Sequence, residues 1–316
     1  MSVEETDIPA TQPPGETRAG FVAVIGAPNA GKSTLVNQMV GAKVSIVTHK
    51  VQTTRARILG IAINGASQIA LIDTPGIFAP KRRLDRAMVS AAWAGAGDAD
   101  AVLLMVDAMG GVTGEVTAIL DGLARHGYGT GKRQALLALN KIDTVKRPVL
   151  LELAAKLDAS GLFSEIFMIS ALNGDGVKDL SAKLAATMPL GPWLYPEDQM
   201  SDLPQRLLAA EVVREKLYIN VHQEVPYALT VETERWEQKK DGSARVEAVV
   251  YVERESQRSI ILGKDGQRIK RIGQSAREEL AEMLDHPVHL FLFVKVRERW
   301  QEDPARYRDW NLDFNV

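Results

Sequence analysis

Short apolar runs alternate with amphipathic, helix-type stretches through the first part of the chain. Several runs are continuously apolar, which is typical of strands buried on both faces of a mainly parallel sheet. Asn64-Gly65 is a hairpin turn signal, so we expect the second and third strands to pair antiparallel. The pattern predicts a doubly wound α/β sheet with helices on both faces. The predicted strands are Phe21–Gly26, Arg57–Ile63, Gln68–Asp73, Ala101–Asp107, Gln134–Asn140 and Ile166–Ser170.

The pattern changes after residue 187. Residues 188–204 contain four prolines, which helices tolerate poorly, and this stretch is interpreted as a linker. The order that follows is helix, strand, strand, helix pair and strand, which predicts a smaller α+β domain. Its expected elements are a helix near Gln205–Val221, strands Leu229–Trp236, Arg245–Glu253 and Val288–Val296, and a helix pair around Gly263. We therefore divide the chain into a disordered polar tail (1–19), a first domain (20–187), the linker (188–204), a second domain (205–299) and a C-terminal tail (300–316).

Composition restricts the class of protein. A chain of 316 residues with 46% hydrophobic content can form two domains with real cores. The sequence has no apolar run long enough to span a bilayer and no signal-peptide layout at its start. The absence of cysteine excludes disulfides and thiolate metal sites and fits a reducing cytoplasm. A net charge of −2 argues against indiscriminate nucleic-acid binding, so any such site must be a local patch.

Residues 26–34 form a phosphate-loop pattern, G-x-x-x-x-G-K-[ST], directly after an apolar strand. Its two glycines allow a tight turn whose N–H groups face inward, and the following helix adds its positive N-terminal end. Lys32 is expected to reach the terminal phosphates, and the Ser33 hydroxyl is a hard oxygen ligand for Mg²⁺. The alternative is a glycine-rich turn without a ligand. The loop residues expected at the nucleotide are Asn29, Ala30, Gly31, Lys32, Ser33 and Thr34.

Three further motifs end predicted strands. Asp73 can hold Mg²⁺ through water, and the Gly76 N–H can meet a γ-phosphate. Asp143 can accept two hydrogen bonds from guanine while Lys141 lies along the base. A site built on such bonds rejects the wrong base by roughly 10⁴-fold, because its buried polar groups would go unpaired. The remaining predicted contacts of the base pocket are Asn140, Ser170, Ala171 and Leu172.

In this order the motifs resemble the translation-factor-related GTPases. The resemblance implies that residues 41–54 are the first switch, whose threonine ligates Mg²⁺ only when a γ-phosphate is present. Thr54 is the preferred residue and Thr53 the alternative. Lys32, Thr54 and Gly76 are then expected to act in catalysis. Ile77 stands where Ras-like enzymes have the glutamine that orients the attacking water, so we expect slow intrinsic turnover.

Two features near the nucleotide stay open. The sequence resembles a subgroup in some of whose members the asparagine at the position of Asn29 helps bind K⁺ in place of an arginine finger. The alternative, of equal weight, is that Asn29 only shapes the loop. A basic run lies in the expected second switch, where a solvated helix start is the favoured interpretation. That run is Lys81, Arg82 and Arg83.

The second domain carries the G-x-x-G signature of a KH module at residues 263–266. Such a turn lets phosphates of single-stranded RNA come close while bases occupy an apolar groove. The order of elements resembles the type II KH arrangement. Residues 254–277 contain seven basic and two acidic residues, although residues 191–316 contain 19 basic and 23 acidic, so positive charge is concentrated there. The predicted RNA contacts are Arg258, Ile261, Gly263, Lys264, Gly266, Arg268, Ile269, Lys270 and Arg271.

Aromatic residues are concentrated in the C-terminal tail, at Trp300, Tyr307, Trp310 and Phe314. They are suited to stacking on bases, and packing of the tail is the alternative.

From about residue 20 to 300, the chain resembles the bacterial GTPases that assist small-subunit ribosome assembly and end in a KH domain. The resemblance implies cycling between GTP and GDP with Mg²⁺, and binding to the 3′ end of small-subunit ribosomal RNA on the 30S particle. It also implies a cytoplasmic protein with peripheral inner-membrane contact, which nothing in the composition supports. We expect a monomer. The alternatives are a GTPase acting on another RNA and a nucleotide-sensing RNA adaptor in which hydrolysis is incidental.

Overall fold

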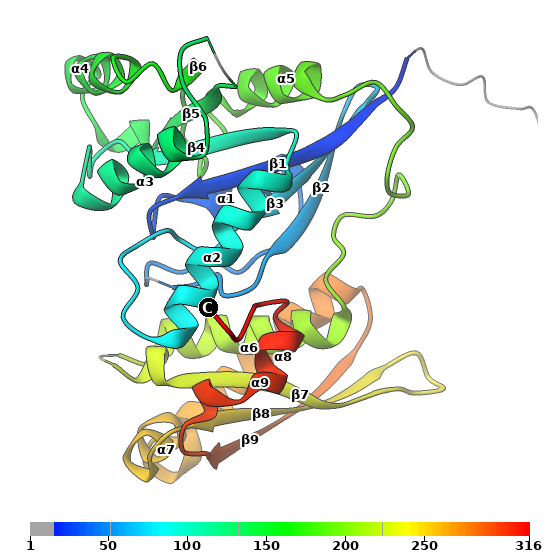
Figure 1. The fold of residues 1–316 in the computed structure, drawn as a ribbon. Helices are drawn as coiled ribbons and strands as arrows, with labels where there is room; N and C mark the ends of the chain where they lie inside the picture. Colours follow the sequence, from blue (N-terminus) through cyan, green and yellow to red (C-terminus); the bar gives the residue numbers. More distant parts are fainter. Residues whose placement is uncertain (1–15, 51, 132, 223) are drawn as a thin grey trace, which may run out of the picture.

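A six-stranded sheet in the order β2-β3-β1-β4-β5-β6 forms the centre of the first domain. The computed structural model describes residues 16–50, 52–131, 133–222 and 224–316 (Figure 1). Among the described strands of this sheet, only the β2–β3 pair is antiparallel, as the Asn64-Gly65 turn predicts. The doubly wound sheet is confirmed. Its strands are β1 Arg18–Gly26, β2 Ile58–Asn64, β3 Ser67–Asp73, β4 Ala101–Asp107, β5 Ala135–Asn140 and β6 Phe163–Met168.

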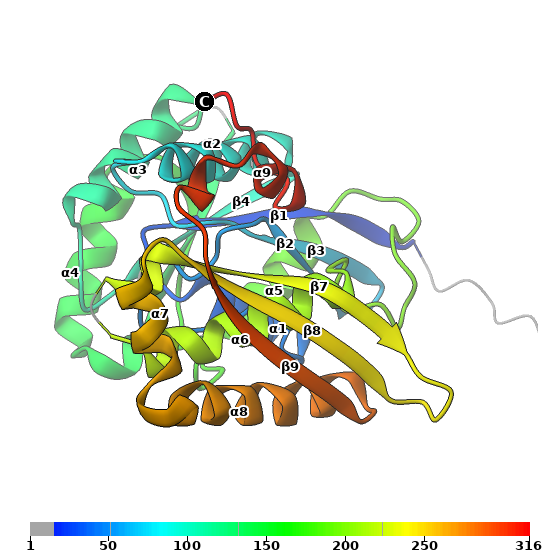
Figure 2. The same cartoon turned by 90° about the horizontal axis from the view of Figure 1, so that it is seen from below.

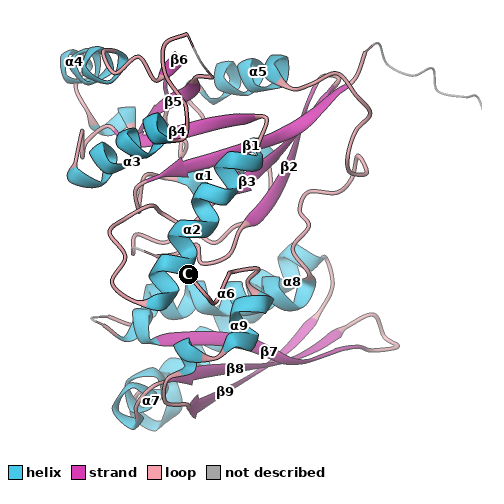
Figure 3. Ribbon diagram, in the orientation of Figure 1, coloured by secondary structure: helices cyan, strands magenta, loops and turns pink. Residues whose placement is uncertain are grey.

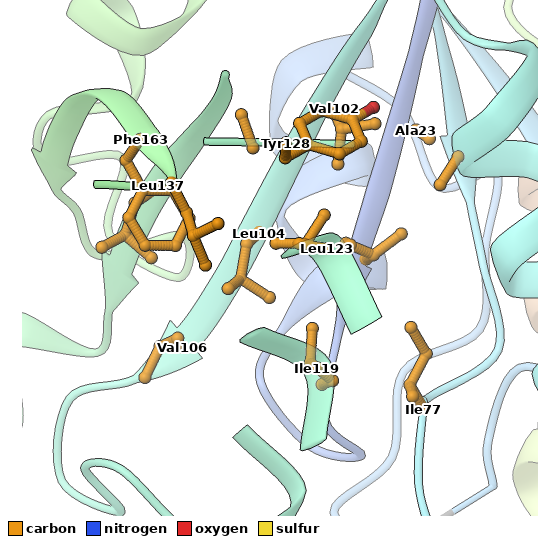
Figure 4. Packing of buried hydrophobic residues seen from close by; sticks show 14 of the residues in the cluster. Ala23, Ile77, Val102, Leu104, Val106, Ile119, Leu123, Tyr128, Leu137 and Phe163 are labelled. Atoms are coloured by element: carbon orange, nitrogen blue, oxygen red, sulfur yellow. The ribbon is translucent and has the colours of Figure 1, made fainter. Parts of the chain in front are cut away.

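Helices cover both faces of this sheet (Figure 3). One apolar cluster joins β1 and β4 to α1 (Lys32–Val40) and α5 (Val177–Thr187). The other joins the opposite face to α2 (Arg83–Asp98), α3 (Gly114–Arg125) and α4 (Arg147–Asp158). Figure 4 shows part of this second cluster, where Leu104 of β4 lies near Leu123 of α3. The sheet is therefore buried on both sides.

The second domain has a three-stranded sheet in the order β7-β8-β9, with β7–β8 antiparallel and β8–β9 parallel. Its helices and strands follow the predicted order, and Figure 2 shows the sheet with α8 beside it. They share one core, in which α6 packs against α8 and β7, and α8 packs against β9. The elements are α6 Gln205–Asn220, β7 Leu229–Gln238, β8 Ala244–Val252, α7 Glu255–Leu262, α8 Gln267–Leu284 and β9 Val288–Val296.

The predicted tail and linker differ from the structure. Residues 1–15 lie outside the described part, but Arg18 and residue 19 belong to β1, so the tail boundary at residue 19 is wrong. These residues pair with β3, and the Arg18 side chain also donates to the Met188 carbonyl at 2.7 Å. The linker is attached to the sheet as well, because Trp193 Nε1 donates to the Ala66 carbonyl at 3.0 Å.

The last strand of the first domain was predicted too late. β6 begins at Phe163 and ends before Ser170. It is an edge strand in which Ser164 and Glu165 are exposed, so its first half lacks the apolar run by which the inner strands were located. Ser170 instead lies in a turn, where its N–H donates to the Asp175 carbonyl.

The C-terminal residues are folded rather than extended. They form the short helices Trp300–Glu302 (η4) and α9 (Pro304–Asp309), which lie between the two domains (Figure 1). Trp300 and Tyr307 are fully buried in a cluster with Leu84 and Met88 of α2. The burial of these aromatic residues therefore supports packing of the C-terminal tail rather than stacking on bases. Among the described residues, no helix is both long enough and apolar enough to cross a membrane.

Candidate nucleotide site and RNA-binding surface

The phosphate loop joins β1 to α1 at the carboxyl edge of the sheet. Gly31 has a left-handed φ of 93°, and a Cβ there would lie 2.2 Å from Asn140 Nδ2, so only glycine fits. Lys32 opens α1 and is buried, with Nζ donating to the carbonyls of Gly26 at 3.2 Å and Ala27 at 3.0 Å. Burial lowers the pKa of Lys32 to about 8, although Asp73 partly opposes the shift. A phosphate at this loop would give the ammonium an anionic partner.

Asp73 ends β3 and is fully buried. Its Oδ2 accepts hydrogen bonds from Ser33 Oγ at 2.6 Å, Ser45 Oγ at 2.6 Å and Thr54 Oγ1 at 3.3 Å. Its Oδ1 is also buried and has no hydrogen-bond partner among the described residues. Burial raises the pKa of Asp73, and the hydrogen bonds and Lys32 oppose that shift. A carboxylate with an unused oxygen beside two hydroxyls fits the hard-oxygen preference of Mg²⁺.

Of the two candidate threonines, the structure brings Thr54 to this group. Its Oγ1 lies 3.0 Å from Ser33 Oγ. Thr53 Oγ1 instead donates to the Lys50 carbonyl at 2.7 Å. Ser45 was missed by sequence reasoning, because it lies in an irregular segment with no motif to mark it.

Gly76 lies against the phosphate loop. A Cβ there would meet the Pro28 nitrogen at 2.9 Å, so a side chain would push the two segments apart. The next N–H, of Ile77, donates to the Gly26 carbonyl at 3.0 Å. The Ile77 side chain is buried in the core near Ile119 (Figure 4), and no polar group at position 77 faces the phosphates.

The basic run at the start of α2 is exposed, as a solvated helix start predicts. It consists of Lys81, Arg82 and Arg83.

Asn140 connects two loops of the base side. Its Nδ2 donates to the Ala30 carbonyl at 2.8 Å, and its Oδ1 accepts from the Ala171 N–H at 2.9 Å. Both ends of this buried amide position the loops. The second N–H and the second oxygen lone pair of the amide leave a contact with the base open. Lys141 forms an ion pair with Asp107 at 2.6 Å. Asp143 is exposed and has no hydrogen bond or ion pair with another described residue, so its carboxylate is available to a ligand.

These segments enclose a cavity of about 400 Å³. Thirteen predicted nucleotide residues line it: Asn29, Gly31, Lys32, Ser33, Thr34, Thr54, Gly76, Asn140, Lys141, Asp143, Ser170, Ala171 and Leu172. Ala30 does not, because its side chain is part of the core, and Asp73 lies buried behind Ser33. One wall, from Ile46 to His49, lies within the expected first switch, although none of its residues was individually predicted to line the site. Asn29 Nδ2 donates to the His49 carbonyl at 3.2 Å and so connects the phosphate loop to this wall.

The G-x-x-G turn joins α7 to α8. Gly263 has φ 72°, and a Cβ there would lie 2.7 Å from Arg268 Cβ. Arg268 donates to the Ile260 carbonyl, and Arg258 donates to the Val294 carbonyl at 3.2 Å, so both guanidinium groups are partly used within the domain. Gly266 also has φ 72°.

Three of the predicted cations at this turn are exposed and have no ion pair among the described residues. These are Lys264, Lys270 and Arg271. Ile261 was assigned to the RNA surface, and this is wrong. It is fully buried, since the apolar side of α7 faces the domain core.

A groove of about 380 Å³ runs between α8 and β9. Lys270 and Arg277 supply positive charge, and Ile269, Leu290 and Leu292 supply apolar surface. Cationic groups beside an apolar groove suit single-stranded RNA, whose phosphates and bases need both kinds of contact. The groove extends the predicted surface to β9, which the motif alone did not identify.

The fold and the two sites define a P-loop GTPase joined to a KH domain. Residues 21–141 match the model of a family described as 50S ribosome-binding GTPase, and residues 224–301 match that of the KH domain. The chain is 61% identical over 299 residues to GTPase Era of Brucella suis biovar 1 (strain 1330), covering 95% of this chain and 94% of the relative. It is 56% identical to GTPase Era of Caulobacter vibrioides (strain NA1000 / CB15N), covering 97% and 100%. The chain belongs to the GTPase Era family.

Two solved structures resemble the whole chain. One is a variant of Era from Aquifex aeolicus bound to GDP.AlF4-, with a TM-score of 0.86 and 36% identity. The other is Era in complex with MgGDPNP and nucleotides 1506-1542 of 16S ribosomal RNA, with a TM-score of 0.87 and 36% identity. Each match covers 95% of this chain and 100% of the other.

The lowered pKa of Lys32 predicts a pH dependence of nucleotide binding. Above pH 8 the free protein loses the Lys32 proton, and phosphate binding must restore it. Affinity for GDP should therefore fall as pH rises through about 8, approaching about tenfold per pH unit until the pKa of the bound state is reached. Titrations with a fluorescent GDP derivative from pH 7 to pH 9.5 measure this slope.

Lys32→Arg is the control, because a guanidinium stays charged over this range. In this variant the change of GDP affinity with pH that the Lys32 proton causes should disappear. Any change that comes from titration of the guanine base should remain. Equal slopes in the two proteins would contradict the assignment.

Proposed function

We propose that this chain is an Mg²⁺-dependent GTPase that binds the 3′ end of small-subunit ribosomal RNA and assists maturation of the 30S particle. The observation that carries the proposal is the cavity that Lys32, Ser33 and Asp143 line together, in which the Asp143 carboxylate has no partner among the described residues. The exposed G-x-x-G turn on the same chain supplies the RNA site. We divide the protein into a GTPase domain up to residue 187, the linker 188–204 and the KH domain that follows.

In the nucleotide site, Lys32 binds the β- and γ-phosphates and the Gly76 N–H orients the γ-phosphate. Ser33, Thr54 and Asp73 would hold Mg²⁺, which neutralises phosphate charge when bound. Ser45 positions Asp73 through their 2.6 Å hydrogen bond. Asp143 selects guanine. Because Ile77 is buried, no side chain at that position orients the attacking water, and slow intrinsic hydrolysis follows.

For the KH domain, support comes from the relative that was solved with nucleotides 1506-1542 of 16S ribosomal RNA. In this chain Lys264 and Lys270 attract the phosphates, and Gly263 and Gly266 allow the backbone to approach them. The groove along α8 receives the bases. The same proposal includes a monomer that acts in the cytoplasm, which sedimentation and cell fractionation test. Peripheral contact with the inner membrane rests on the family resemblance alone, and failure of the purified protein to sediment with anionic vesicles would refute it.

Asp143→Asn should change the base preference from GTP toward xanthosine triphosphate, because an amide donor suits the 2-oxo group of xanthine. Competition of both triphosphates against fluorescent GDP measures the ratio of affinities. Asp158→Asn, an exposed change at the end of α4, should leave that ratio unchanged. Retained guanine selectivity in Asp143→Asn would place the base pocket elsewhere.

Lys264→Asp should weaken binding of a single-stranded 16S 3′-end RNA by at least ~1 to 2 kcal/mol, because one phosphate attraction is lost and one repulsion is added. Filter binding at fixed salt measures the effect. Lys178→Asp is the matched control, since Lys178 is exposed on α5 of the other domain and has the same charge change. If both variants lose the same affinity, the G-x-x-G turn is not the RNA site.

We also propose that Asn29 contributes to a K⁺ site. Its side chain lines the phosphate cavity and reaches the His49 carbonyl, a second oxygen that a cation can use. GTP turnover in K⁺ should then exceed turnover in Na⁺ at equal ionic strength, and Asn29→Ala should abolish the difference. Equal rates in both salts for the unmodified protein would leave Asn29 only as a residue that shapes the loop.

A further inference from the structure

Arg55 follows Thr54 in sequence, and its side chain leaves the GTPase domain. We propose that Arg55 is a positioning residue for the nucleotide site, held in an aromatic cage by the KH domain and the C-terminal segment so that Thr54 stays beside Ser33 and Asp73. The inference rests on the proposed role of Thr54 as the threonine that responds to the γ-phosphate. It adds a specific residue and a specific segment, 300–316, to the control of that response.

The cage is formed by residues distant in the chain. Arg55 is 2% exposed, and its guanidinium donates to the Leu229 carbonyl at 2.9 Å and to Tyr218 Oη at 3.0 Å, across 174 and 163 residues of sequence. Its Cζ lies 6.0 Å from the ring centre of Tyr218, 5.5 Å from Trp300 and 6.0 Å from Trp310. Arginine can combine such planar contacts with directed hydrogen bonds, which lysine cannot reproduce.

The segment that carries Thr54 needs external anchors. Its described residues between 42 and 57 contain no helix and no strand, so no ladder of backbone hydrogen bonds sets their shape. Instead, Arg214 of α6 donates to the Thr53 carbonyl, and the Val47 N–H donates to Glu215 Oε1 at 2.8 Å. Lys50 donates to the Val221 carbonyl at 2.6 Å. Arg55 completes this set on the other side of Thr54.

The C-terminal segment also contacts the expected second switch. Arg83 at the start of α2 stacks over the Phe314 ring at 4.3 Å, and Arg86 Nε donates to the Val316 carbonyl at 3.2 Å. Figures 1 and 2 both show this segment between α2 and the KH domain. The segment that supplies Trp300 and Trp310 to Arg55 is therefore also braced against α2, the helix that follows Gly76. One segment thus contacts both the residue after Thr54 and the expected second switch.

Loss of the Arg55 contacts should affect the binding of a nucleoside triphosphate and of a diphosphate differently. Thr54 matters only to the nucleotide that has a γ-phosphate, so loosening its anchor should weaken triphosphate binding alone. If the competent arrangement falls to about a tenth of the population, apparent affinity falls about tenfold. A general loss of structure would instead weaken both nucleotides.

Affinities for GDP and for a non-hydrolysable GTP analogue, with Mg²⁺, test the proposal in the full chain. Arg55→Lys and Trp310→Ala should each weaken the analogue by about tenfold and leave GDP within about twofold. Thr54→Ala should have the same selective effect, and adding Arg55→Lys to it should change little further, because both act through one contact. Arg245→Ala is the control. This arginine also lies over an aromatic ring, with its Cζ 4.8 Å from the ring centre of Phe291, but it is part of β8 and not of the contact with Arg55.

The outcomes separate the two levels of the proposal. If the ratio of the affinities for the GTP analogue and for GDP is the same in Thr54→Ala as in the unmodified protein, the proposed role of Thr54 fails. If this ratio falls in Thr54→Ala while Arg55→Lys and Trp310→Ala keep it, the cage has no positioning role and the present inference fails. Equal loss of both nucleotides in the cage variants also overturns it. Thermal unfolding checks folding, and Arg55→Lys decides the test alone if Trp310→Ala does not fold.

Discussion

The buried carboxylate of Asp73 holds the nucleotide site together. One of its oxygens accepts from Ser33, Ser45 and Thr54, and the other has no partner among the described residues. Burying an ionised carboxylate costs several kcal/mol, which three hydroxyl groups and the charge of Lys32 only partly offset. The arrangement therefore favours a cation at the free oxygen. Because the hydroxyls come from separate segments, the same carboxylate also fixes where the first switch crosses the phosphate loop.

The other side of that switch is fixed by the KH domain. Lys43 pairs with Glu215 at 2.5 Å and also with Glu279 of α8, the helix that follows the G-x-x-G turn. Arg214 reaches the backbone at Thr53 from α6. A segment without secondary structure is thus held between the Asp73 carboxylate and the KH domain. A change in either neighbour must alter the balance of forces on the other, which is the physical basis of coupling between the two sites.

Sequence reasoning succeeded where the signal was local. The strand Ala101–Asp107 has the predicted bounds, and Asp73 and Asn140 end their strands as expected, because buried inner strands produce unmistakable apolar runs. It failed at the edge strand β6, whose outer residues are polar, and at Ile261, because a short apolar run does not show which side of a helix meets the core. It missed Ser45 and Arg55 for a different reason. Their importance comes from partners such as Asp73 and Tyr218, which only the folded chain brings near.

The chemistry of the domain contact indicates why it suits a switch. Two of its members are the buried cations Arg55 and Arg214. Arg55 donates to the Leu229 carbonyl and to Tyr218 Oη, and Arg214 pairs with Glu211 of its own helix while donating to the Thr53 carbonyl. Buried charged contacts add little net stability because desolvation offsets them, yet losing one partner of such a contact is costly. Displacing one partner of such a contact therefore leaves a buried charge uncompensated, so partial displacement is unfavourable. An interface with these properties tends to be either fully formed or fully open, so a small movement of Thr54 at the γ-phosphate can be converted into a change of domain arrangement.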